Sequence, residues 1–185
     1  PDCHFYQCAE ILQAGYNVYV EKPAFLSFYQ LSEIIRICNE KKTLLIEGLM
    51  YQYSKLFEEF KLAFQKDLKQ INKIECSFII PETPQNSFRQ KGTFGSSIAF
   101  DIGCYPMSLF SAVRMYPNLA SFIIRKKRIG PDKIFLYEGA LYQNEIPISF
   151  QIGFGGYYEN RVSLNLKDGA KKNFEPFFYG RQGSR

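Results

Sequence analysis

The chain has 185 residues, a formal net charge of +5, 46% hydrophobic residues and 22% charged residues. This composition is typical of a globular protein and excludes a disordered, collagen-like or low-complexity chain. A membrane-spanning helix needs a run of about 18 apolar residues. The sequence contains no such run, so we predict no membrane partner.

The N-terminal part of the chain alternates between helical and strand-like patterns. Residues 4–14 have apolar positions at helical spacing, and residues 18–20 form a short β-branched and aromatic run that is typical of a strand. Ser27 and Gln30 resemble a capping box before a second helix, and residues 44–46 form another buried strand. This β-α-β alternation with short connections predicts a parallel sheet with crossover helices.

The pattern then changes. Residues 56–64 carry an apolar helix face, and residues 71–80 alternate with the period of a strand. A loop rich in Pro, Ser and Gly covers residues 81–97, and a helix begins within residues 101–106. Four strand-like runs follow without helices between them, at residues 119–124, 134–142, 146–153 and 160–166. Successive strands of this kind predict a mostly antiparallel sheet.

The fold class expected from these elements is the tail of an α/β domain followed by an α+β domain, with the boundary near residue 48. The chain begins with Pro1 instead of Met and opens directly into an amphipathic pattern. We therefore expect it to be a piece of a longer protein.

Cysteine usage bears on the compartment. The five cysteines are scattered and form no C-x-x-C pair, which favours reduced thiols without a zinc site or a disulfide framework. No basic-then-apolar leader opens the chain, so no secretory signal is visible. These features predict a cytoplasmic protein that binds no metal.

Two short motifs carry side chains suited to catalysis. Glu21-Lys22-Pro23 stands at the predicted carboxyl end of a strand, the edge where open parallel sheets bind ligands. A lysine there can hold an oxyanion or lower a neighbour's pKa. The alternative is an ordinary strand end whose charges face solvent, and the tripeptide by itself favours that plainer interpretation.

The second motif is the segment 101–106, DIGCYP. Asp101 and Tyr105 are four residues apart, so both can lie on one face at the start of a helix. Asp101 could instead be a plain N-cap that bonds only backbone amides. Tyr105 could be a core aromatic with a satisfied hydroxyl.

Together, the two motifs resemble the glucose-fructose oxidoreductase/inositol dehydrogenase/MocA (Gfo/Idh/MocA) family of NAD(P)-dependent oxidoreductases. In that family a helix opening with His leads to the pattern aGxxVxxEKP, which corresponds here to His4 and residues 14–23. The later family pattern GGGaLlDiGcYp corresponds to residues 95–106, preceded by Phe88-Arg89. Residues 47–53 and 153–160 resemble two further stretches of one branch of the family.

The branch with Tyr in the second motif includes dihydrodiol dehydrogenases and reductases of the 3-keto group of nucleotide-linked sugars. The resemblance implies that residues 1–48 are the C-terminal part of a Rossmann NAD(P)-binding domain. It implies that residues 49–185 form an open, mostly antiparallel sheet domain with flanking helices, which binds substrate and oligomerises. The implied reaction moves a hydride between NAD or NADP and a carbonyl or carbinol of a sugar, nucleotide sugar or polyol.

The resemblance also implies roles for individual residues. Lys22, Asp101 and Tyr105 would be catalytic. Tyr105 would give a proton to the developing alkoxide, and Lys22 would bring the tyrosine pKa from about 10 toward neutrality or bond the reacting oxygen. Asp101 would orient the substrate or Lys22. The implied cofactor-binding residues are His4, Glu21, Lys22 and Pro23, and the implied substrate-binding residues are Lys22, Tyr53, Arg89, Asp101 and Tyr105. His4 could also simply begin a helix.

The sequence departs from the family pattern in several places. Ser96 and Ser97 replace two glycines, Gln52 replaces an Arg, and no G-x-G-x-x-G turn for the cofactor phosphates occurs, so we expect weak dinucleotide binding by this chain alone. These departures favour an alternative function, a truncated and non-catalytic family member that serves as a binding or assembly module.

Partners follow from the remaining surface patterns. The basic run at residues 125–128 could contact nucleic acid or an anionic substrate, or be a solvated strand end. No RNA- or DNA-binding signature accompanies it, so we predict no nucleic-acid partner. We interpret the aromatic residues as a core plus one exposed sheet face. By resemblance, that face is expected to mediate a homo-oligomer. The resemblance also implies a small sugar-like substrate.

Overall fold

The computed structural model describes residues 1–81, 84, 86–90, 93–114, 123–129, 134–143, 146–154 and 157–178, with backbone alone at 90, 94, 123–129 and 134–143. The chain divides into two compact units. The first contains Pro1–Leu49 and Pro84–Cys104, and the second contains Met50–Thr83 and Tyr105–Arg185. The chain leaves the first unit after Leu49 and returns to it at Pro84, which a single boundary near residue 48 does not represent. A substrate domain over residues 49–185 stays a prediction.

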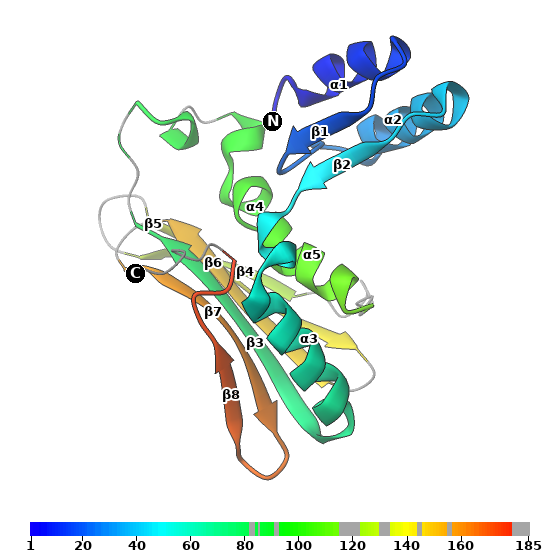
Figure 1. Cartoon of the computed structure of the whole chain (residues 1–185). Coiled ribbons are helices and arrows are strands. Elements are labelled where there is room, and N and C mark those ends of the chain that lie inside the picture. The colour runs from blue at the N-terminus through cyan, green and yellow to red at the C-terminus, as the bar shows by residue number, and fades with distance from the viewer. Residues whose placement is uncertain are drawn as a thin grey trace, which may run out of the picture. The chain divides into compact units, whose positions relative to one another are not determined.

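The first unit is a β-α-β arrangement preceded by a helix, as the N-terminal pattern predicts. Its elements are α1 (His4–Gln13), β1 (Val18–Glu21), α2 (Phe28–Lys41), β2 (Leu45–Gly48), η3 (Phe88–Gln90), η4 (Phe94–Ser96) and α4 (Ile98–Asp101) (Figure 1). Strands β1 and β2 pair in parallel, from Val18 opposite Leu45 to Glu21 opposite Gly48. Both strands therefore end at the same edge of the sheet.

Helices α1 and α2 bury their apolar faces with alternate residues of β1. Leu12 of α1, Ile34 of α2 and Val20 of β1 belong to one buried cluster. Burying a side chain of this size stabilises the fold by roughly 1.5–3 kcal/mol. Tyr19, between the two inward-facing valines of β1, is exposed, as the alternation of a strand requires.

The start of α2 follows the predicted cap with one change. Ser27 Oγ accepts a hydrogen bond from the Gln30 amide at 3.2 Å, which satisfies one free N–H of the first turn. In a reciprocal capping box the Gln30 side chain would accept from the Ser27 amide. Instead Gln30 Oε1 accepts from the Leu26 amide at 2.9 Å, one residue further back.

The second unit is a six-stranded sheet with helices over one face. Its elements are η1 (Met50–Tyr53), α3 (Lys55–Asp67), η2 (Leu68–Gln70), β3 (Ile71–Ile80), α5 (Cys104–Ala112), β4 (Ile123–Ile129), β5 (Ile134–Gln143), β6 (Ile146–Phe154), β7 (Glu159–Leu166) and β8 (Lys171–Phe174). The strand order is β4-β5-β6-β3-β7-β8. β3 pairs in parallel with β6, and the other pairs are antiparallel, which confirms the predicted mostly antiparallel sheet.

Several predicted boundaries need correction. The strand expected at residues 119–124 lies partly outside the described residues, and the described strand β4 runs from Ile123 to Ile129. Strand β8 was not predicted. The helix expected to start within residues 101–106 is α5, which begins at Cys104. The short helix α4, which precedes it and ends at Asp101, is not predicted by the sequence pattern.

Aromatic side chains form the core between the sheet and the helices. α3 and α5 lie over the same face of the sheet (Figure 1). Phe60 of α3 contacts Phe174 of β8, with ring centroids 5.3 Å apart. Tyr105 of α5 contacts Phe78 of β3, with centroids 5.0 Å apart.

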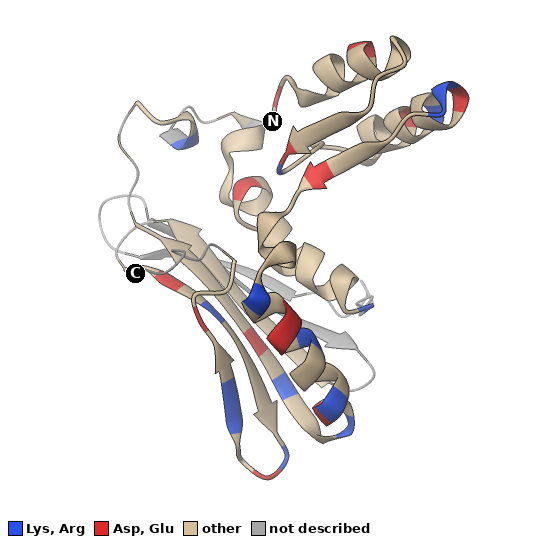
Figure 2. Cartoon of the chain, in the orientation of Figure 1, with Lys and Arg blue, Asp and Glu red and all other residues tan. Residues whose placement is uncertain are grey.

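The exposed aromatic sheet face stays a prediction, because the side chains of β4 and β5 lie outside the described residues. Over β3, β7 and β8, the face away from the helices is mostly polar. Strand alternation places mostly polar residues there, among them Glu75, Ser77, Arg161, Ser163 and Asn165. Lys and Arg lie close to Asp and Glu along these strands and along α3 (Figure 2). Of the helices that the structure describes, none is long and apolar enough to cross a membrane.

Candidate functional site

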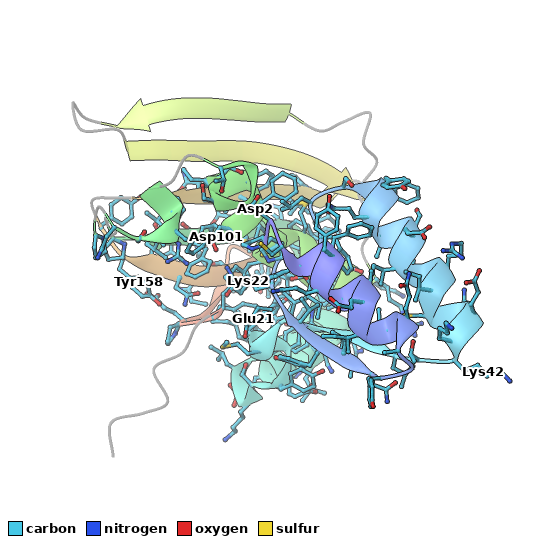
Figure 3. All side chains as sticks on the ribbon, turned by 90° about the horizontal axis from the view of Figure 1, so that it is seen from above. Asp2, Glu21, Lys22, Lys42, Asp101 and Tyr158 are labelled. Atoms are coloured by element: carbon cyan, nitrogen blue, oxygen red, sulfur yellow. The ribbon has the colours of Figure 1, made fainter. Side chains whose placement is uncertain are left out.

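The structure brings together the two motifs that the sequence analysis singled out. Lys22 follows the last residue of β1, and Asp101 is the last residue of α4. The Lys22 Nζ donates to Asp101 Oδ1 at 2.6 Å and to the Asp101 backbone carbonyl at 2.6 Å. Figure 3 shows the two labelled side chains next to one another. A contact across 79 residues of sequence makes a solvent-facing strand end the wrong interpretation for Lys22.

Arg89 is the second cation on the same carboxylate. Its Nε donates to Asp101 Oδ2 at 2.5 Å, and its Nη2 donates to Oδ1 at 3.4 Å. The Asp101 side chain is 2% exposed, against 13% for Lys22 and 27% for Arg89. A carboxylate this buried needs charged partners to offset its lost hydration. The three groups together carry one net positive charge.

Asp101 is therefore not the plain N-cap that the sequence left open. It stands at the end of α4, and its carboxylate bonds side chains of two other segments. Ion pairs buried in low dielectric are stronger than those in water, so this cluster holds the β1 end and the segment of η3 in a defined relation to α4 within the first unit.

The peptide unit between Pro23 and Ala24 is hydrogen-bonded by a side chain on each side. His4 Nδ1 lies 3.1 Å from the Pro23 carbonyl oxygen, and because a carbonyl only accepts, the histidine nitrogen is the donor. Glu47 Oε1 accepts from the Ala24 amide at 2.9 Å. The Lys22–Pro23 bond is cis. Of the predicted cofactor-binding residues, Glu21 is exposed and Pro23 is buried, and no contact of either with a cofactor is tested by the structure.

Tyr105 lies in the aromatic core of the second unit. The residue is 5% exposed. Its ring contacts Phe78 at 5.0 Å, Phe178 at 5.4 Å and Tyr51 at 6.0 Å between centroids. The core-aromatic interpretation describes this ring well, and the role of Tyr105 as a proton donor stays a prediction. Tyr53, the predicted substrate contact, is 79% exposed in η1.

Cys104 is close to the charged groups of the first unit. Burial raises the pKa of its thiol to about 12, with Glu47 and Asp101 adding to the rise and Lys22 opposing it. A thiol with such a pKa stays protonated at neutral pH and is a poor nucleophile. The electrostatic influence of all three residues on one thiol indicates that they share its neighbourhood.

Two further residues, Glu47 and Tyr51, are not individual candidates by their sequence pattern. Glu47 stands in β2 next to the strand's last residue, so the argument that selected Lys22 from the carboxyl end of β1 also applied to it. Tyr51 is 3% exposed, and its hydroxyl lies 2.8 Å from Ser108 Oγ of α5. Tyr51 lies in the family-like stretch at residues 47–53, from which Tyr53 alone is selected as a site residue.

The first unit presents groups that suit one end of a nicotinamide cofactor. Lys22 offers an ammonium donor and Glu47 a carboxylate acceptor near the carboxyl ends of β1 and β2, which fit a carboxamide and sugar hydroxyls. A pyrophosphate needs a run of backbone amides at a helix N-terminus, and the sequence has no G-x-G-x-x-G turn to supply it. Among the residues the structure describes, no group of three His, Cys, Asp or Glu side chains could hold a metal ion.

Comparison with known proteins gives matches in structure alone. No family model matches the chain, and no curated protein matches its sequence. Among solved structures, the chain matches myo-inositol 2-dehydrogenase from Lactobacillus plantarum with a TM-score of 0.78 at 16% identity, over 92% of this chain and 54% of that one. It matches a putative myo-inositol dehydrogenase from Sinorhizobium meliloti 1021 with a TM-score of 0.77 at 12% identity, over 94% and 54%.

A third match is KijD10, a 3-ketoreductase from Actinomadura kijaniata in complex with NADP and TDP-benzene. The TM-score is 0.74 at 19% identity, over 89% of this chain and 51% of that one. This chain has the fold of these oxidoreductases. It spans about half the length of each of the three. The enzyme classes that these names state agree with the class that the sequence motifs resemble.

Proposed function

We propose that this chain is part of an NAD(P)-dependent oxidoreductase of the Gfo/Idh/MocA type that acts on a sugar, a nucleotide sugar or a related polyol. The observation that carries the proposal is the contact of Lys22 with Asp101 at 2.6 Å. It unites two motifs that resemble a single catalytic site. The enzymes with the same fold, named as inositol dehydrogenases and a 3-ketoreductase, support the sugar class of substrate.

In this proposal each residue has one task. The bound cofactor supplies or accepts the hydride. The Lys22 ammonium, held by Asp101, stabilises negative charge that develops on the reacting oxygen, and Tyr105 exchanges a proton with that oxygen. Arg89 holds the second oxygen of Asp101 and, with Tyr53, contacts the substrate. His4, Glu21, Lys22 and Pro23 contribute to the cofactor site, and the assembly is a cytoplasmic homo-oligomer.

The test is an assay of the purified whole protein of which this chain is part, and it follows the absorbance of the nicotinamide. NADPH and NADH are paired with keto sugars and nucleotide-linked keto sugars, and NADP and NAD with inositols. We expect turnover with at least one pair, reduced at least about 100-fold in Tyr105→Phe, as general acids contribute 10²–10⁴-fold. Lys22→Met should lose activity as well, whereas Lys55→Met, which changes an exposed lysine, should not. Full turnover in Tyr105→Phe would overturn the acid assignment, and no turnover with any pair would overturn the proposal.

A second candidate function, a non-catalytic binding or assembly module, is favoured by the deep burial of the Tyr105 residue at 5% exposure. A tyrosine ring packed among Phe78 and Phe178 stabilises the core whether or not it takes part in catalysis. Titration calorimetry separates the two functions. Binding of a nucleotide sugar without turnover in any assay favours the module, and binding with turnover favours the enzyme.

A further inference from the structure

The peptide unit between Pro23 and Ala24 has both of its polar groups bonded by side chains. Its carbonyl accepts from His4 Nδ1 at 3.1 Å, and its N–H donates to Glu47 Oε1 at 2.9 Å. Because a peptide unit is planar, two bonds on opposite sides fix the orientation of the whole plane. Ala24 is 7% exposed, so water offers little competition for these bonds.

The two side chains come from different elements. His4 is the first residue of α1, and Glu47 lies in β2. The plane is therefore tied to the helix and to the neighbouring strand together. Lys22 stands immediately before Pro23, so these two hydrogen bonds also fix the position of the Lys22 backbone, from which its side chain extends. Its ammonium then reaches Asp101 at 2.6 Å.

A lysine side chain has four rotatable bonds and loses much rotamer freedom when held in one place. A fixed backbone at Lys22 reduces the number of side-chain conformations that are lost when the ammonium binds Asp101.

We propose that His4 and Glu47 are positioning residues that clamp the Pro23–Ala24 peptide and so hold the Lys22 ammonium on Asp101. In this role His4 acts through the backbone, because its Nδ1–H donates a hydrogen bond to the Pro23 carbonyl. The consequence for catalysis rests on the proposed function; the clamp itself does not.

The structural test needs no cofactor or substrate. Amide hydrogen exchange at Ala24 and the ammonium signal of Lys22 are followed by NMR in uniformly isotope-labelled protein. We expect Glu47→Met, which cannot accept the N–H, to speed Ala24 exchange at least about ten-fold and to remove the Lys22 signal. Glu47→Gln keeps an acceptor oxygen and should retain both. Glu10→Met, at an exposed position of α1, is the control.

A second pair of variants makes the test independent of β2. His4→Phe removes the donor to the Pro23 carbonyl, whereas His4→Asn keeps one, so only His4→Phe should lose the Lys22 signal. This pair decides the question if Glu47→Met does not fold. Unchanged Ala24 exchange in Glu47→Met, or an unchanged Lys22 signal in His4→Phe, would overturn the clamp.

The kinetic test separates this inference from the proposed function. In an active protein, Glu47→Met and His4→Phe should lower kcat by roughly 10- to 100-fold with little change in KM, because displacement of a catalytic group costs that much. Glu47→Gln and His4→Asn should restore most of kcat. If the unmodified protein has no activity, the proposed function fails, and the exchange result alone still confirms or overturns the clamp.

Discussion

Asp101 is the residue on which the candidate site depends. Its carboxylate is almost fully buried and is bonded by Lys22 on one oxygen and by Arg89 on both. Burying an ion costs several kcal/mol, which charged hydrogen bonds can offset. Because two cations share one carboxylate, the cluster keeps a positive charge that suits a developing oxyanion.

Asp101→Asn tests this dependence, because the amide keeps the size of the side chain and removes its charge. Lys22 and Arg89 would then be partly buried cations without their shared counter-charge. We expect the free energy of unfolding to fall by about 2–4 kcal/mol, measured by urea denaturation. Any turnover should fall with it.

Glu59→Gln is the matched control for that variant. Glu59 pairs with Lys55 at 3.9 Å, and both side chains are more than half exposed. A surface pair of this kind contributes less than about 0.5 kcal/mol. A loss in Asp101→Asn no larger than that in Glu59→Gln would contradict the importance of the buried cluster.

Serine caps set where the two longest helices begin. Ser27 Oγ accepts from the Gln30 amide before α2, and Ser54 Oγ accepts from the Phe57 amide at 3.1 Å before α3. The first N–H groups of a helix have no partner within the helix. These caps satisfy one such group each, and both helices place a face of apolar residues into a core.

Ser27→Ala should lower the free energy of unfolding by about 1 kcal/mol, because it removes a cap. Ser32→Ala is the control, since Ser32 is exposed inside the same helix and its hydroxyl bonds only the Phe28 carbonyl. Alanine is the better helix former there, so this variant should be neutral or slightly stabilising. Equal thermal or urea stability of the two variants would argue against the capping role.

Asn160 attaches the segment after β8 to the sheet. The residue is fully buried. Its Oδ1 accepts from the amides of Phe177 and Phe178 at 3.0 and 2.7 Å, and its Nδ2 donates to the Tyr158 hydroxyl at 2.9 Å. Phe178 in turn packs against Tyr105, so one amide side chain supports a large part of the aromatic core.

Asn160→Ala should lower the free energy of unfolding by about 1–3 kcal/mol, because the buried Phe178 amide loses its side-chain acceptor, whereas the Phe177 amide keeps the Asn160 backbone carbonyl at 3.1 Å. The near-ultraviolet circular dichroism of the tyrosines should weaken as the core loosens. Asn165→Ala removes an asparagine from the polar face of the same strand, where it bonds Glu75 at 3.2 Å, and should cost less than half as much. The reverse order of the two losses would refute this role of Asn160.

At the scale of the whole molecule, the sheet of the second unit separates two environments. One face of β3, β7 and β8 packs aromatic rings under the helices, and the other carries charged residues around Glu75. Lys171 and Lys73 each donate to the Glu75 carboxylate at 2.8 Å. These hydrogen bonds, led by that of Lys171, lower the pKa of Glu75 from 4.5 to about 2.

This shift predicts how the stability of the protein depends on pH. A carboxyl whose pKa is lower in the folded state contributes stability above its unfolded pKa, and loses it as pH falls through the folded pKa. The contribution of Glu75 is therefore complete above about pH 5 and disappears toward about pH 2. Because its side chain is 36% exposed, solvent screening limits the contribution to about 1 kcal/mol.

Urea unfolding of the protein and of Glu75→Gln checks this. The variant should be less stable by about 1 kcal/mol near pH 6, and the difference should shrink as the pH is lowered toward 3. Glu59→Gln, whose pair with Lys55 is long and exposed, should show no comparable trend. A difference that grows at low pH would mean that the sign of the pKa shift is wrong.

Local sequence patterns predict most of the helices and strands, and the family resemblance adds the candidate catalytic residues. Periodicity predicted α1, β3 and the parallel β-α-β order, and Ser27 was visible as a cap, because these features depend on residues a few positions apart. The two motifs around Lys22 and Asp101 could also be selected, since short spacings carry them.

Only the tertiary structure decided how distant groups combine. Asp101 could be an N-cap or an ion-pair partner by its local pattern, and the approach of Lys22 and Arg89 settled it in favour of the ion pair. The parallel pairing of β3 with β6, the return of Pro84–Cys104 to the first unit and the bond of Glu47 to Ala24 were likewise set by the path of the chain. Contacts of this kind depend on which surfaces are buried together, and local hydrogen bonding does not specify that.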